Sequence, residues 1–154
     1  MRPLSSPVRE NRFLGLVELG IGFFFAVAAG VLNPIEAAVG IVAGTAIVGG
    51  AMSVVRIRGA ARATQTARPA PTDEREEPDA LPRRIAWPVA GQVAVSLVLV
   101  AAARSPGLVA GIAFGIGIAM MVTSRWLERW ENANDVSVLR EPGRRSLYIA
   151  PRKR

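Results

Sequence analysis

Residues 13–56 decide the fold, and they read FLGLVELGIGFFFAVAAGVLNPIEAAVGIVAGTAIVGGAMSVVR. This stretch contains two apolar runs, residues 13–32 and 35–55, joined by the dipeptide Asn33-Pro34. A helix of about 20 apolar residues crosses a hydrocarbon core about 30 Å thick, and each run has that length. The stretch therefore predicts two membrane-spanning helices that form a hairpin.

The turn of this hairpin carries the signals of a helix start. Asn33 suits an N-cap, because its side chain can accept a backbone N–H bond, and Pro34 suits the first helical position, where its missing donor costs nothing. Glu36 follows Asn33 at the spacing of a capping box.

A second hairpin follows the same plan. The apolar runs 85–103 and 108–124 flank Ser105-Pro106, which repeats the pairing of a polar residue with proline. In both hairpins the entering helix carries one strongly polar residue about a third of the way in, Glu18 and Gln92. We predict two hairpins arranged as a parallel repeat. Gene duplication and a chance likeness between apolar hairpins both account for the pattern.

The composition favours a membrane protein over a soluble one. Hydrophobic residues make up 51% of the chain and charged residues 20%, and the charges lie mostly outside the four apolar runs. A soluble amphipathic helix would instead carry polar residues at every third or fourth position. We expect an all-α integral membrane protein with four transmembrane helices. Its expected parts are an N-terminus (1–12), a first hairpin (13–55), a flexible charged loop (56–84), a second hairpin (85–124) and a basic tail (125–154).

The positions of the basic residues predict the orientation. The Asn33-Pro34 turn contains no Lys or Arg, and the second turn contains only Arg104. Because basic residues favour the cytoplasmic side, we expect both termini and the 56–84 loop in the cytoplasm, at a bacterial plasma membrane. The net charge of +7 should then meet the anionic lipids of the cytoplasmic leaflet rather than nucleic acid.

The segments outside the spans differ in character. The loop contains the acidic run 73–79 and several prolines, and such a composition predicts flexibility. In the tail, residues 125–131 should extend the fourth helix. Beyond them, residues 136–139 and 146–149 flank a Pro-Gly turn, which predicts a small β-hairpin. Two strands alone are marginal in water, so this hairpin would need support from another segment.

Cysteine and histidine are absent from the sequence. Their absence excludes disulfides, thiolate nucleophiles and the usual zinc and copper sites. Carboxylates are not paired within any span, and no nucleotide-binding loop or catalytic triad stands out. We therefore predict neither an enzyme nor a cofactor or metal site.

Glu18 is the one ionisable side chain inside a predicted span. It shares a helical stripe with Gly22 and Ala29, which predicts that it faces protein rather than lipid. An intramembrane carboxylate is a functional candidate because burying it is costly. The alternative is that Glu18 reaches water near the interface or pairs with Arg56 or Arg125 at neighbouring helix ends.

Other residues in the spans suggest contacts between helices. Gln92 and Ser96 lie one turn apart and could either hydrogen-bond between helices or form a polar pathway with Glu18. Glu36 and Arg104 could pair at the outer rim. Close helix packing inside the bundle is expected at glycines spaced about one helical turn apart, namely Gly40, Gly44, Gly107, Gly111 and Gly115. Aromatic anchors at the membrane interface are expected at Trp87, Trp126 and Trp130.

Two functions remain open. The first is a non-enzymatic accessory or interaction subunit of a larger membrane assembly, bound to another membrane protein or to a second copy of itself. This reading is favoured because a large share of the chain is charged and lies outside the spans.

The second is a small proton-coupled transporter. Four spans with a glutamate in the first one resemble the small multidrug resistance exporters, and the resemblance implies that Glu18 is the coupling carboxylate. The long 56–84 loop departs from that family. So does the lack of aromatic pocket residues inside the spans, since the only tyrosine, Tyr148, lies in the tail.

Overall fold

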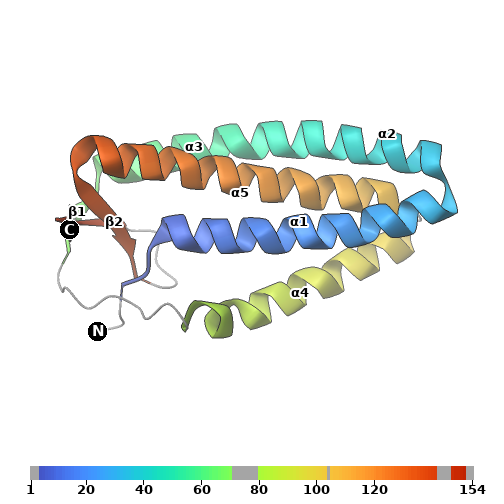
Figure 1. Cartoon of the computed structure of the whole chain (residues 1–154), viewed down its shortest axis with the longest axis horizontal. Helices are drawn as coiled ribbons and strands as arrows, with labels where there is room; N and C mark the ends of the chain where they lie inside the picture. The colour runs from blue at the N-terminus through green and yellow to red at the C-terminus, as the bar shows by residue number, and fades with distance from the viewer. Residues whose placement is uncertain (1–3, 71–79, 104, 142–146, 152–154) are drawn as a thin grey trace.

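The computed structural model of the chain describes residues 4–70, 80–103, 105–141 and 147–151. It is mostly helical, with a small three-stranded sheet at one end (Figure 1). The elements in chain order are α1 (Pro7–Leu32), α2 (Pro34–Gly44), the π-helical segment η1 (Thr45–Gly49), α3 (Gly50–Gln65), β1 (Arg68–Pro69), α4 (Ala80–Ala103), α5 (Pro106–Asn134), β2 (Val136–Arg140) and β3 (Leu147–Pro151).

Three helices are long and apolar enough to cross a membrane. They are α1 (Pro7–Leu32), the continuous helix Pro34–Gln65 formed by α2, η1 and α3, and α5 (Pro106–Asn134). In α4 the apolar stretch among the described side chains is Val89–Val98. The prediction of a helical membrane protein is confirmed to this extent, and the count of four spans stays a prediction.

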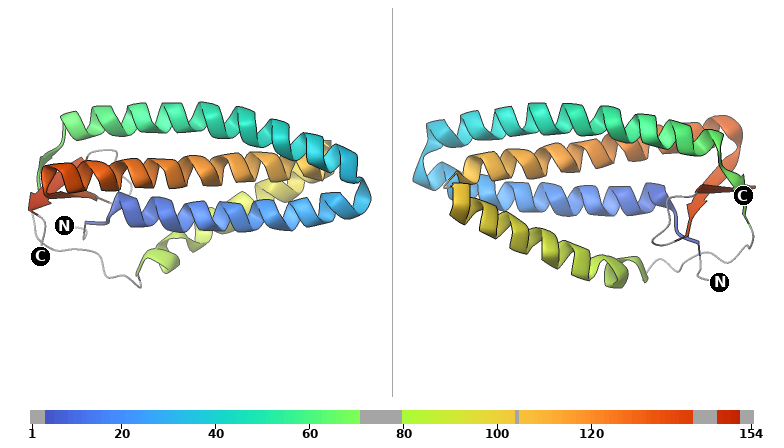
Figure 2. Two further views of the ribbon diagram at one scale, coloured as in Figure 1. Left: turned by 45° about the horizontal axis from the view of Figure 1, so that its top comes forward. Right: turned by 180° about the vertical axis from the view of Figure 1, so that it is seen from behind.

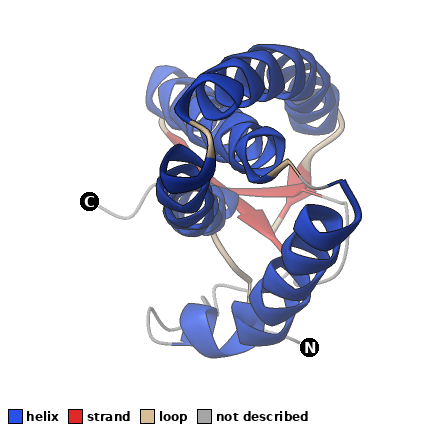
Figure 3. Cartoon of the chain, turned by 90° about the vertical axis from the view of Figure 1, so that its right-hand side faces the viewer, coloured by secondary structure: helices blue, strands red, loops and turns tan. Residues whose placement is uncertain are grey.

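The helices form a compact three-helix bundle and one outlying helix. α5 lies between α1 and the α2–α3 helix, so it packs against both helices of the first hairpin (Figure 1). α4, its own hairpin partner, approaches the bundle near the start of α5 and leans away toward its N-terminal end (Figure 2). Figure 3 looks along the bundle and shows the strands beyond the helices at the far end. The parallel-repeat arrangement stays a prediction.

Local sequence signals set the helix ends. Ser6 caps α1 with its side chain, and Pro7 takes the first helical position. At the hairpin turn Asn33 Oδ1 accepts a 3.3 Å hydrogen bond from Glu36 N, as the capping pattern predicts. The Asn33 N–H donates to Ala29 O at 2.9 Å, which closes α1. The capping box is therefore only half formed, because its second donor serves the preceding helix.

Regular structure extends into two segments expected outside the spans. α1 begins at Pro7, within the predicted N-terminal segment 1–12. The segment 56–84 continues as helix to Gln65, contributes β1, and contains the start of α4. Alanine and arginine are frequent after Val55, and both favour helix over loop. The acidic run 73–79 lies outside the described residues.

The predicted tail hairpin is present, and it has a third strand. β2 and β3 pair antiparallel, with Val138 opposite Ile149, while the Pro-Gly turn between them lies outside the described residues. β1 pairs parallel to β3, with Arg68 opposite Tyr148, and the strand order is β1-β3-β2. The support that an isolated hairpin lacks thus comes partly from the segment that follows α3.

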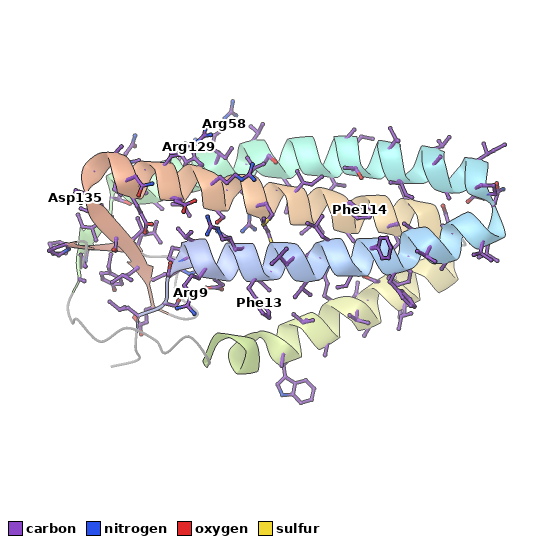
Figure 4. All side chains as sticks on the ribbon, viewed as in Figure 1. Arg9, Phe13, Arg58, Phe114, Arg129 and Asp135 are labelled. Carbon is purple, nitrogen blue, oxygen red and sulfur yellow. The ribbon has the colours of Figure 1, made fainter. Side chains whose placement is uncertain are left out.

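Two further features fasten the sheet to the bundle. Ser5 and Arg140 exchange two backbone hydrogen bonds of 2.8 Å each. A buried apolar cluster joins the same segments, made of Leu4, Leu139 and Ala150. Asp135, labelled in Figure 4, adopts a left-handed conformation with φ of 51° and turns the chain from α5 straight into β2.

Candidate functional site

Glu18 lies on the face of α1 that packs against α5. A Cβ atom added at Gly15 or at Gly22, on either side of Glu18, would lie 3.0 Å from a side chain of α5. Glu18 is 7% exposed, and its Oε2 atom has no hydrogen-bond partner among the described residues. The part of the chain that the structure describes shows no ion pair from Glu18 to Arg56 or Arg125. The carboxyl group therefore lies between two helices without an ion-pair partner in the described part of the chain.

The polar pair on α4 forms no hydrogen bond with Glu18 Oε2 among the described residues. Ser96 is 6% exposed and Gln92 is half-buried. A polar pathway through Glu18, Gln92 and Ser96 therefore stays a prediction.

The five glycines predicted to allow close packing lie on one interface, between α2–η1 and α5. An added Cβ would lie 2.7 Å from Leu108 N at Gly40, 2.9 Å from the Gly111 carbonyl carbon at Gly44, and 2.6 Å from Gly40 O at Gly111. Cβ atoms at Gly107 and Gly115 would each lie 2.7 Å from backbone of the same partner helix. Thr45 Oγ1 also donates to Gly111 O at 3.3 Å. The two helices thus meet backbone to backbone.

The π-helical segment η1 keeps this interface in register. Gly40 and Gly44 face Gly107 and Gly111, but the residue facing Gly115 is Gly49, one position later than a regular helical step from Gly44. The extra residue is taken up by η1, since a π-helical turn closes its bonds over five residues instead of four. Gly49 was not predicted from the sequence, because its place opposite Gly115 depends on the π-helical turn.

The predicted rim and interface residues lie at separate places. Glu36 is exposed beside the first turn, and Arg104 lies outside the described residues, so their pairing stays a prediction. Trp87 is 85% exposed on α4. Trp126 and Trp130 are half-buried on the last turns of α5, toward the sheet.

A polar cluster at the sheet end of the bundle was missed from the sequence. Arg56 Nη2 on α3 donates to Asn11 Oδ1 on α1 at 2.7 Å. Arg140 Nη2 on β2 forms a 2.7 Å ion pair with Glu10 Oε2. The available signal was the Ser6-Pro7 helix start, which places residues 10 and 11 on a helix rather than in a tail.

The side chains gathered at these two places are carboxyl, amide and guanidinium groups. A carboxyl group inside a bundle can carry a proton, and guanidinium groups bind anions. The described residues include no group of three or more acidic side chains that could hold a metal ion. Comparison with protein-family models, with curated proteins and with solved structures found no match for this chain.

Proposed function

We propose that this protein is a non-enzymatic accessory subunit of a larger membrane assembly in a bacterial plasma membrane. The supporting observation is the position of α4 outside the three-helix bundle. α5 packs against α1 and against the α2–η1 helix through glycine contacts, whereas α4 leans away from the bundle and carries exposed apolar side chains. Trp87, Val95 and Val98 are 85%, 57% and 66% exposed. In a membrane, a helix of this kind meets lipid or the helix of a partner.

α4 also presents small residues at helical spacing. Ala86, Ala90 and Ala94 are exposed, and a Cβ atom added at Gly91 would meet nothing within 4 Å. Small residues on one helix face let another backbone approach closely, which is how α5 packs inside the bundle. We infer that α4 is a fourth span and that its alanine face receives a helix of the partner, or of a second copy of this chain.

The sheet end of the bundle is proposed to lie in the cytoplasm. Arg56, Arg58 and Arg62 lie on the part of α3 that approaches the sheet, and the opposite turn at Asn33-Pro34 has no basic residue. Basic residues are retained on the cytoplasmic side during insertion. The sheet then offers the partner a folded cytoplasmic contact beside the membrane.

The test is extraction of the full chain from its native membrane in a mild detergent, followed by measurement of the mass and composition of the complex. We expect a second protein, or a second copy, at fixed stoichiometry. The double variant Ala90→Leu/Ala94→Leu should release it, because leucine blocks a close helix approach. The matched control Ala38→Leu/Ala46→Leu changes exposed positions on α2 and η1 and should retain it. A single chain in every extract would contradict the proposal.

A second candidate function is proton-coupled transport, and the isolation of Glu18 favours it. A buried carboxyl oxygen without a partner is costly, and in transporters such groups carry protons. Glu18→Gln in proteoliposomes should then abolish uptake of a lipophilic cation driven by a proton gradient. Under the accessory function the same variant should still co-purify with the partner.

A further inference from the structure

An open cavity of about 420 Å³ lies at the sheet end of the bundle, where α1, α3, α5 and the tail hairpin meet. Two arginines line it, Arg56 from α3 and Arg140 from β2, and the described lining residues include no acidic side chain. Gly59, Ala60 and Ala63 leave room on the α3 side. The volume falls within the range of about 300–1,000 Å³ that is usual for small-ligand sites.

Both guanidinium groups keep donors that the protein does not use. Arg56 Nη2 donates to Asn11 Oδ1, and Arg140 Nη2 pairs with Glu10 Oε2. The Nε atoms of both arginines have no hydrogen-bond partner in the described part of the chain. A bound anion would supply the negative charge that the described lining of the cavity lacks.

The cavity lies where a membrane-spanning bundle would meet lipid headgroups. Asn11 and Arg56 each lie about 33 Å along their helices from the Asn33-Pro34 turn, at a rise of about 1.5 Å per residue. The hydrocarbon core is about 30 Å thick, so both residues would lie just past it. Leu127 and Leu147 add apolar lining beside the arginines. In a phospholipid headgroup, the phosphate could contact the arginines and the attached glycerol could contact the apolar lining.

We propose that the Arg56–Arg140 cavity binds a phosphate group. Guanidinium groups match phosphate oxygens in geometry and form short, charge-assisted hydrogen bonds with them. The phosphate belongs either to an anionic phospholipid of the adjoining leaflet or to a soluble compound. The inference does not rest on the partner subunit proposed above, because the cavity is formed within one chain.

The experiment uses the purified full chain in a mild detergent. In one arm, native mass spectrometry measures retention of phosphatidylglycerol against phosphatidylcholine. In the other arm, calorimetry measures binding of inorganic phosphate. Arg56→Gln and Arg140→Gln should each weaken binding of the phosphate probe by about tenfold, as expected for loss of one charge-assisted hydrogen bond. Arg58→Gln and Arg129→Gln are the matched controls, because both side chains are exposed, and Figure 4 shows Arg58 pointing away from the bundle.

A second variant tests the cavity without removing a charge. Gly59 lines the cavity and has open space around an added Cβ, so Gly59→Leu should fill the cavity without distorting α3. Gly50→Leu, also on α3 with open space and outside the lining, is its control. Comparison of Gly59→Leu with Gly50→Leu tests the phosphate site even if the arginine variants do not fold.

Three outcomes are distinguishable. Preferential retention of phosphatidylglycerol that Gly59→Leu and the arginine variants reduce, and that the controls keep, supports the site and assigns it to lipid. Phosphate binding with the same variant pattern, together with equal retention of both lipids, supports the site and assigns it to a soluble compound. If neither probe separates wild type from Gly59→Leu and the arginine variants, the inference is overturned.

Discussion

α5 and α4 belong to the same predicted hairpin, yet they meet the rest of the molecule in different ways. α5 presents Gly107, Gly111 and Gly115 to the α2–η1 helix, at distances where even one methyl group would collide with backbone. α4 leans away from the bundle, and a Cβ added at its Gly91 would meet nothing within 4 Å (Figure 2). Both helices are apolar, so apolarity does not decide which helices touch.

The difference between the two helices follows from matched small residues. α5 also carries Gly117, whose added Cβ would lie 3.0 Å from Gly15 O on α1. α5 therefore presents glycines to both α1 and the α2–η1 helix. In a membrane no hydrophobic force drives helices together, and close packing supplies much of the attraction. α4 has small residues as well, but its Gly91 meets no matching small surface, since an added Cβ there has nothing within 4 Å.

The largest expected effect comes from breaking the close contact of α5. Gly111→Ala would place a Cβ 2.6 Å from Gly40 O, and a backbone atom cannot move aside as a side chain can. We expect a loss of stability of about 3 kcal/mol, the upper end of the usual cost of overpacking. Thermal unfolding in detergent measures it. The control Gly30→Ala meets nothing within 4 Å and should be neutral or stabilising, by up to about 1 kcal/mol, through helix propensity. Equal effects of the two variants would contradict the close contact.

The next largest effect on stability is expected at Glu18, whose buried Oε2 atom has no hydrogen-bond partner among the described residues. Glu18→Leu keeps a similar volume and removes the unpartnered Oε2, so we expect a gain of about 1–2 kcal/mol in the free energy of unfolding. Glu18→Gln keeps a polar group in the same place and should gain less. A loss of stability in Glu18→Leu would show that the carboxyl group has a stabilising partner.

A smaller effect on stability is expected from the ion pair between Arg12 on α1 and Glu128 on α5. Arg12 Nη2 and Glu128 Oε2 form an ion pair of 2.5 Å, but both side chains are more than two-fifths exposed, at 47% and 42%. Exposed pairs contribute about 0.2–1 kcal/mol, so Arg12→Gln should lower stability by no more than that. High salt should reduce the difference between the two proteins further. A salt-independent loss would mean that the arginine acts through packing.

The smallest effect is expected on α4. Ala94→Leu adds bulk at an exposed position, and for the isolated chain we expect a change within about 0.5 kcal/mol. The same measurement made on the intact assembly should show a larger loss if α4 receives a partner helix. A large loss in the isolated chain would instead place α4 against the bundle and remove the contrast with α5.

Much of the fold could be predicted because its signals are local. Asn33-Pro34 and Ser105-Pro106 place two helix starts, and the Pro-Gly turn indicates the hairpin of β2 and β3. The five packing glycines could be singled out because their spacing follows the helical period. Gly49 could not be singled out in this way, because its alignment depends on a π-helical turn that only the contact with α5 makes visible.

The candidate sites were harder to predict. The burial of Glu18 could be anticipated from its helical stripe, but the lack of a partner at Oε2 could not, since that depends on where the neighbouring arginines lie. Arg56 and Arg140 are far apart in sequence, and no local pattern links the two residues. Their shared cavity exists only once the sheet is placed against α1 and α3.

By itself the sequence determined the apolar helices, their ends and the tail hairpin, because length, hydrophobicity, capping and turn residues act over a few neighbouring positions. Only the tertiary structure decided that α5, rather than α4, fills the bundle, that Arg68–Pro69 adds a parallel strand, and that two arginines meet beside one cavity. Those outcomes depend on contacts between distant segments. Such contacts are set by the fit of whole surfaces, so no short stretch of residues encodes them.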